Sequence, residues 1–160
     1  MTSSAITARE PNEVRLGRNI HVNLLLLAQR NRAAMETICH DEGLTEPQYA
    51  ALWTLCLVDP DGVGMPIGSV TDGLINRAAD TTRLVDRLAR SGLVERLPNP
   101  DDRRSVLVRA TDEGRRAFAS VTPNLQAWHR TQWSALSAAE QVDLNRLLAK
   151  ALWPDGPPTN

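Results

Sequence analysis

The sequence has few of the residues that mark secreted, membrane or metal-binding proteins. It has only two cysteines among 160 residues and no apolar segment of the kind found in signal peptides, so we expect reduced thiols and a cytoplasmic protein. The longest apolar run, Leu24 to Ala28, is far too short to span a bilayer. We therefore expect no membrane partner.

The sequence also lacks the side-chain groupings on which most enzymes depend. Its histidines, cysteines and acidic residues do not have the spacing of metal ligands. It shows no nucleophile–base pair, no phosphate-binding loop and no pair of catalytic carboxylates. These absences predict a protein without a metal, a cofactor or an enzymatic activity.

The composition is that of a globular protein, with 42% apolar and 23% charged residues. A chain of this length can bury one sizeable core. We expect a single domain over residues 12–153, preceded by a disordered leader at 1–11 and followed by a tail at 154–160.

Hydrophobic periodicity predicts a mainly α-helical chain with a small β hairpin. Expected helices cover about 12–40, 45–58, a short segment from Pro66, 79–91 and, interrupted near Pro123, 112–153. Expected caps are Asn12, Thr111 and the capping boxes at 45–48 and 137–140, and Gly43 is the expected stop of the first helix. Strand-like stretches at 93–97 and 105–110 flank a turn at 98–104. A helix–turn–helix followed by such a hairpin is a winged helix.

Arginine is concentrated in one part of the chain. Residues 77–109 hold eight arginines and five acidic residues, whereas the whole chain has a net charge of −1. On a helix over 79–91, three arginines share one face and three apolar residues share the opposite face. The two sets are Arg83, Arg87, Arg90 and Leu84, Val85, Leu88.

Two interpretations of this arginine face are open. It is a solvated surface whose charges pair along the helix, as Asp86 with Arg90, each pair contributing a few tenths of a kcal/mol. Alternatively it enters the major groove of DNA, where the guanidinium group bonds guanine or phosphate. Arg103 and Arg104 at the tip of the hairpin favour DNA, because a neighbouring wing can reach the minor groove.

In combination, three stretches of this sequence resemble the MarR family of winged-helix transcription regulators. Residues 43–55 resemble the family's second helix, 81–96 its recognition helix and first wing strand, and 101–114 its Asp-x-Arg wing motif. The resemblance covers nearly the whole chain. The sequence departs from the family pattern at Ala110, where leucine is usual, and at 75–80, before the recognition helix.

The resemblance implies roles for individual residues. Asp102 and Arg104 match the wing motif, in which the arginine enters the minor groove and the aspartate stabilises the wing through an ion pair. The recognition helix and the segment before it are expected to contact the rest of a double-stranded DNA site. The residues expected to contact DNA are Arg77, Thr82, Arg83, Arg87, Arg103 and Arg104.

The resemblance also implies a homodimer. The winged helix is expected at about 45–111, and dimerisation helices at about 12–40 and 112–153. A twofold dimer would place two recognition helices about 34 Å apart and read a pseudo-palindromic operator. A monomer whose long helices pack together is the alternative.

Many members of the family bind small aromatic or phenolic anions between their DNA-binding and dimerisation parts. Arg18, His21 and Trp53 are the expected ligand-binding residues here, although core packing explains the tryptophan equally well. Cys39 is either an oxidant sensor, as cysteines in some relatives are, or a structural thiol, which the sequence favours; Cys56 is expected to be inert.

The resemblance therefore implies a sequence-specific DNA-binding regulator, most often a repressor that a small effector releases from DNA. One alternative is a small-molecule-binding protein of the same fold that has lost operator binding. The other is a protein-interaction module whose arginine face meets an acidic partner.

Overall fold

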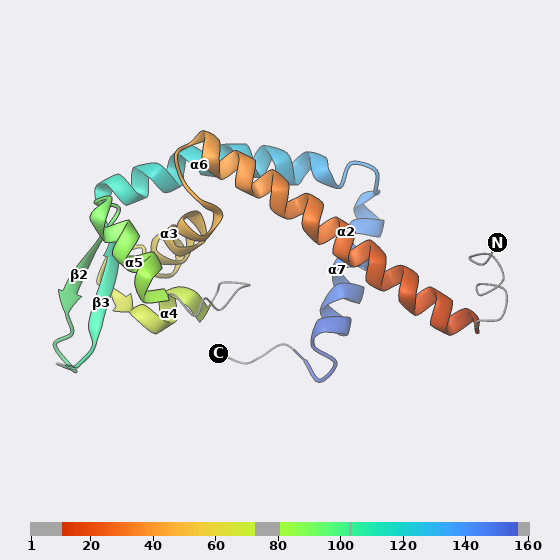
Figure 1. Cartoon of the computed structure of the whole chain (residues 1–160), viewed down its shortest axis with the longest axis horizontal. Coiled ribbons are helices and arrows are strands. Elements are labelled where there is room, and N and C mark those ends of the chain that lie inside the picture. Colours follow the sequence, from red (N-terminus) through yellow and green to blue (C-terminus); the bar gives the residue numbers. More distant parts are fainter. Residues whose placement is uncertain (1–10, 73–80, 103, 157–160) are drawn as a thin grey trace, which may run out of the picture. The chain divides into compact units, whose positions relative to one another are not determined.

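The computed structural model describes residues 11–72, 81–102 and 104–156 (Figure 1). The chain divides into two compact units, Met1–Val121 and Thr122–Asn160. Most of the leader predicted at 1–11, and the last residues of the predicted tail, lie outside the described residues. The single domain predicted over 12–153 stays a prediction.

The first described helix, α2, covers Asn12–Asp41. Its N-cap is Pro11 and has no side-chain cap, so the prediction that Asn12 caps the first turn was wrong; its side chain accepts a hydrogen bond from Arg15 instead. The predicted stop at Gly43 is confirmed. This residue has a φ of 76°, and the Gly43 and Leu44 amides bond the carbonyl oxygens of the last helical turn.

The next helix, α3, covers Glu46–Val58 and begins with the predicted capping box. The hydroxyl of Thr45 accepts from the Gln48 amide, while the Gln48 side chain accepts from the Thr45 amide. Ala51, Leu52 and Leu55 of this helix are buried. Val58 is 61% exposed because the helix ends there and the chain turns into the loop at 59–64.

A small sheet follows, with three antiparallel strands in the order β1-β3-β2. These strands are β1 (Met65–Pro66), β2 (Val94–Pro98) and β3 (Val106–Ala110). The hairpin of β2 and β3 was predicted, but β1 was not. Pro66 was expected to open a helix, whereas it ends β1, and the helix α4 begins one residue later and covers Ile67–Asp72. The fold class, mainly helical with a small sheet, is confirmed.

The helix before the hairpin, α5, covers Thr81–Arg90. Its apolar residues Leu84, Val85 and Leu88 are buried, as their spacing predicts. The helix α5 ends at a glycine, as α2 does. The Gly92 and Leu93 amides donate to the carbonyl oxygens of Ala89 and Leu88 at 3.0 and 2.9 Å. The chain can therefore turn directly from α5 into β2.

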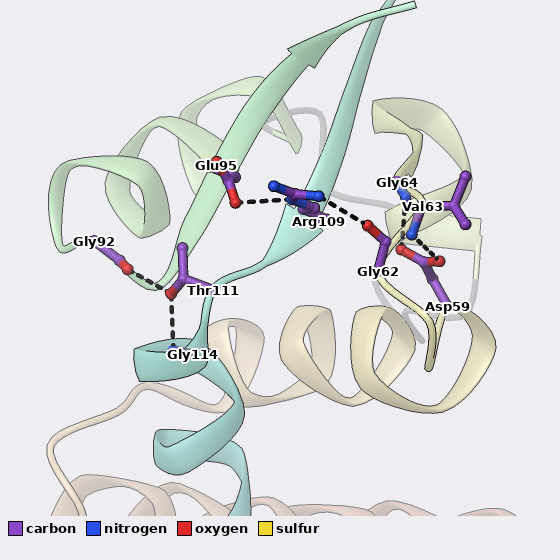
Figure 2. Close-up of polar contacts among 9 residues, drawn as sticks. All are labelled: Asp59, Gly62, Val63, Gly64, Gly92, Glu95, Arg109, Thr111 and Gly114. Carbon is purple, nitrogen blue, oxygen red and sulfur yellow. Dashed lines mark hydrogen bonds and ion pairs between the residues drawn. The ribbon is translucent and has the colours of Figure 1, made fainter.

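The hairpin meets the next helix, α6 (Asp112–Gln132), at a close junction. The Thr111 hydroxyl accepts a hydrogen bond from the Gly114 amide at 3.0 Å and donates one to the Gly92 carbonyl at 2.7 Å (Figure 2). This confirms the predicted cap. A methyl group on Gly114 would lie 2.0 Å from the Leu93 carbonyl oxygen, so only glycine fits here. Phe118 on α6 stacks on Tyr49 of α3.

One prediction about the last helices was wrong. The helix α6 continues through Pro123, which lacks an amide hydrogen to bond the preceding turn, rather than stopping there. The capping box at Ser137 and Glu140 is confirmed and opens α7, which covers Ala138–Leu152. Within the ranges described, no helix is both long and apolar enough to cross a membrane.

Both cysteines are buried thiols. Burial, together with the nearby Glu46 carboxylate, raises the pKa of Cys39 to about 11. Burial also raises the pKa of Cys56, although Arg115 opposes this shift. Because the thiolate is the form that reacts with oxidants, this environment favours the structural role of Cys39 over the sensor role.

We expect Gly114→Ala to lower the free energy of unfolding by about 3 kcal/mol, because the added methyl group must push the Leu93 carbonyl aside. Urea denaturation followed by circular dichroism measures this change. Gly68→Ala is the matched control, since its methyl group meets nothing within 4 Å. Equal denaturation midpoints for the two variants would show that the junction is not tightly packed.

We also expect Cys39 to resist alkylation in the folded protein. At pH 8, a thiol with a pKa of about 11 holds on the order of a hundredfold less thiolate than an ordinary cysteine. The rate of iodoacetamide modification, read by peptide mass spectrometry, should therefore be at least that much slower in the native chain than in urea. Similar rates in both conditions would contradict the buried environment.

Candidate nucleic-acid interface

The helix α5 presents its polar face to solvent. Thr82, Arg83, Arg87 and Arg90 are all exposed, on the side opposite the buried leucines and valine. Among the residues that the structure describes, no acidic side chain pairs with Arg87. Arg87 thus presents an exposed guanidinium group on this face.

The ion pair between Asp86 and Arg90 along α5 does not form as the surface interpretation expects. The Asp86 carboxylate instead lies 2.5 Å from the Arg96 guanidinium on β2. Arg90 donates through Nε to the main-chain carbonyl of Asp86 at 3.3 Å. The acidic residue of the arginine face is therefore bound to the first strand of the hairpin.

A second arginine ties the hairpin to the preceding loop (Figure 2). Arg109 on β3 donates to the Glu95 carboxylate on β2 at 2.7 Å and to the Gly62 carbonyl at 3.3 Å. The loop itself is folded around Asp59, whose carboxylate accepts from the amides of Val63 and Gly64 at 2.9 and 2.8 Å. These contacts hold the root of the hairpin against the loop between α3 and β1.

The turn between β2 and β3 is shaped by short polar side chains. The Asp102 carboxylate accepts a hydrogen bond from the Arg104 amide at 2.9 Å. Asn99 accepts from the Asp101 amide and donates to the Ser105 hydroxyl at 2.6 Å. The side chain of Arg104, which lies on this turn, is exposed.

The structure brings most of the predicted DNA-contacting residues into one compact unit. Thr82, Arg83 and Arg87 lie on α5, and Arg104 lies on the hairpin that follows it (Figure 1). Arg77 and Arg103 lie outside the described residues. Contact with DNA stays a prediction for all six.

The predicted ligand-binding residues lie on two helices. Arg18 and His21 are exposed on α2, and Trp53 on α3 is 44% exposed. An ion pair of 3.7 Å between Arg32 and Glu46 joins these helices. Arg32 is the residue of α2 at which the two helices are joined. Along the axis of α2, Arg18 lies about 21 Å from it. A pocket formed by the three predicted residues stays a prediction.

Sequence reasoning missed two structural arginines, Arg96 and Arg109. A signal existed for the second, because Glu95 and Arg109 are direct cross-strand partners once the hairpin is aligned. For the first there was none, since its partner Asp86 lies on a helix ten residues earlier. The described residues contain no group of three or more histidines, cysteines or carboxylates able to hold a metal ion.

The region that contains α5 and most of the hairpin also matches a known protein family. Residues 72–106 match the model of the MarR family. The chain is 30% identical over 114 residues to the uncharacterized HTH-type transcriptional regulator YsmB of Bacillus subtilis, covering 71% of this chain and 75% of that protein. It is 27% identical over 138 residues to the transcriptional repressor MprA of Escherichia coli, covering 83% and 72%.

Solved structures agree with these relatives. A mutant MarR from Escherichia coli, complexed with operator DNA, superposes with a TM-score of 0.72 at 29% identity, covering 88% of this chain and 96% of that one. BpsR of Bordetella bronchiseptica, whose DNA binding is regulated by 6-hydroxynicotinic acid, superposes with a TM-score of 0.69 at 26% identity, covering 83% and 98%. The chain therefore belongs to the MarR family of winged-helix transcription regulators, which are not enzymes.

Proposed function

We propose that this regulator is a cytoplasmic repressor that binds a pseudo-palindromic operator as a homodimer and is released by a small aromatic or phenolic effector. The observation that carries the proposal is the exposed arginine face of α5, held in one unit with an exposed arginine on the hairpin turn. If the arginine face of α5 were only a solvated surface, it would not need to lie in the same unit as an exposed arginine on the hairpin.

The helix α5 supports contact with the major groove. Its buried face packs against the winged-helix core, so the opposite face, with Arg83 and Arg87, is the one a duplex meets. The planar guanidinium group bonds guanine O6 and N7 together or grips a phosphate. Thr82 on the same face is short enough to bond a phosphate oxygen.

The hairpin supports contact with the minor groove. Hydrogen bonds to Asp102 and Asn99 restrain the backbone near Arg104. Arg104 therefore loses less conformational entropy on binding DNA than it would on an unrestrained loop. Guanidinium groups are attracted by the negative potential of a narrow minor groove. Asp102 therefore contributes by shaping the wing rather than by meeting DNA.

The terminal helices support a homodimer. In the single chain, large apolar side chains at least 43% exposed gather on α2 and α7. They are Val14, Leu16, Ile20, Val22, Leu24, Leu25, Leu26, Val142, Leu147 and Leu152. A protein of this size rarely leaves so many apolar side chains in water, and a second copy would cover them.

Relatives support both repression and release. MprA is a transcriptional repressor by name, and 6-hydroxynicotinic acid regulates the DNA binding of BpsR. An effector releases the operator only when it binds the free and DNA-bound conformations with different affinity. Arg18, His21 and Trp53 are the residues we assign to the aromatic anion, with the guanidinium group and imidazole as polar anchors and the indole as an apolar wall.

We expect the wild-type protein to prefer DNA from upstream of its own gene over an unrelated duplex, and Arg87→Ala and Arg104→Ala each to weaken that binding about tenfold to a hundredfold. Each loss also removes a positive charge, so the slope of log affinity against log salt should fall by about one where a phosphate contact is lost. Fluorescence anisotropy at several salt concentrations measures both quantities.

The matched control is Arg116→Ala, which removes the same charge from an exposed residue of α6 that pairs with Glu113 at 2.5 Å. Its affinity should change little. Should Arg87→Ala and Arg104→Ala bind like this control, the assigned contact surface is wrong. Should the wild-type protein prefer neither upstream DNA nor any duplex from a random library, the protein is better described as a ligand-binding member that has lost its operator.

We expect Leu26→Glu, which places a charge at a side chain of α2 that is 60% exposed in the single chain, to break the dimer. Light scattering after gel filtration should give the wild type twice the chain mass of 17.6 kDa and the variant a value that falls toward one chain on dilution. Val63→Glu is the control, since Val63 is 72% exposed on a loop outside these helices. A wild-type mass of one chain would exclude the dimer.

A further inference from the structure

The arginine face of α5 contains an acidic residue that ought to oppose DNA binding. Asp86 lies between Arg83 and Arg87 in the sequence and next to them on the helix, with a side chain 43% exposed. A carboxylate at this place repels phosphate. In this structure its charge is paired with the Arg96 guanidinium at 2.5 Å, a residue on β2 rather than on α5.

The ion pair spans an open gap between helix and strand. A hollow of about 420 Å³ lies on this side of α5 and β2, lined by Asp86, Ala89, Arg90 and Arg96. Leu88 of α5 and Val94 of β2 are both buried. Among the described residues, the contact between Asp86 and Arg96 links α5 to β2 at this hollow.

Arg96 lies beyond the root of the hairpin, so its contact with Asp86 restrains the direction of the hairpin. Among the described residues, Thr111 ties the root of the hairpin to the Gly92 carbonyl, and β1 pairs with β3 at Val108 and Leu107. Arg96 lies opposite Val108, two residues nearer the turn than the first pair of the ladder, Val94 with Ala110. Beyond the root, β1 restrains the ribbon at its β3 edge, whereas the contact of Arg96 with Asp86 ties the β2 edge directly to α5.

We infer that Asp86 and Arg96 are a positioning pair that sets the angle between the recognition helix and the wing. The inference rests on the proposed DNA-binding function and adds residues to it that the arginine pattern did not indicate. With the angle set, Arg87 on α5 and Arg104 on the wing engage one duplex at the same time. Without it, the wing must be oriented during binding, which weakens specific association.

The test is Asp86→Asn, because the positioning role and simple charge repulsion predict opposite signs. If Asp86 acts only through its charge, removing that charge tightens binding to every duplex. If it positions the wing, affinity for the duplex that the wild type prefers falls about tenfold, while affinity for an unrelated duplex stays equal or rises. Fluorescence anisotropy with both duplexes, at one salt concentration, separates these outcomes.

Asp143→Asn is the matched control. It removes the same charge from an exposed aspartate of α7 that pairs with Arg146 at 3.2 Å, and it should leave the preference between duplexes unchanged. Thermal unfolding of Asp86→Asn should match the wild type closely, because exposed ion pairs contribute little to stability. If Asp86 only stabilised the fold, a weaker preference between the duplexes would come with a lower unfolding temperature.

The double variant Asp86→Asn with Arg96→Gln tests whether the two residues act as a unit. It should bind the preferred duplex as weakly as Asp86→Asn alone. A further large loss, with a reduced salt slope, would show that Arg96 contacts phosphate and would overturn the positioning role. A wild type that prefers no duplex overturns the proposed function and this inference with it. Preference in the wild type together with equal or tighter binding by Asp86→Asn overturns the inference alone.

Discussion

The close approach of Gly114 to the Leu93 carbonyl is the constraint on which the rest of the DNA-binding unit depends. At this one place α5 has just ended, β2 begins and α6 starts, and the Thr111 hydroxyl bonds groups on both sides of the junction. Because the backbones touch, the directions of α5, the hairpin and α6 are fixed together. A side chain at Gly114 would push the Leu93 carbonyl away and disturb this junction.

Arginine has a structural use in this protein and a second, proposed use in DNA recognition. Arg96 and Arg109 are bound to carboxylates of their own chain and hold the hairpin against α5 and against the loop at 59–64. Arg87 and Arg104 point outward, on elements that those contacts hold in place. Since a guanidinium group carries several donors in a fixed plane, it suits both bracing of carboxylates and recognition of DNA. A count of charges along the sequence does not separate the two uses.

The predictions from sequence succeeded where the deciding interactions are local. The capping boxes at Thr45 and Ser137, the stop at Gly43 and the buried face of α5 all depend on residues within one or two turns. They failed where a distant partner or a neighbouring turn overrides the local preference. β1 exists only because Met65 and Pro66 pair with β3, forty residues away, and α6 continues through Pro123 because the turns on both sides sustain it.

The sequence by itself determined the family, the order of helices and hairpin, and the arginine face of α5, because periodicity and capping act over short stretches of chain. Tertiary structure alone decided which arginine binds the Asp86 carboxylate. Asp86 was expected to pair with Arg90, four residues along the same helix, yet its carboxylate binds Arg96 after the chain has reversed direction at Gly92. An ion pair forms with whichever guanidinium group the backbone brings within reach, and that distance is set by folding.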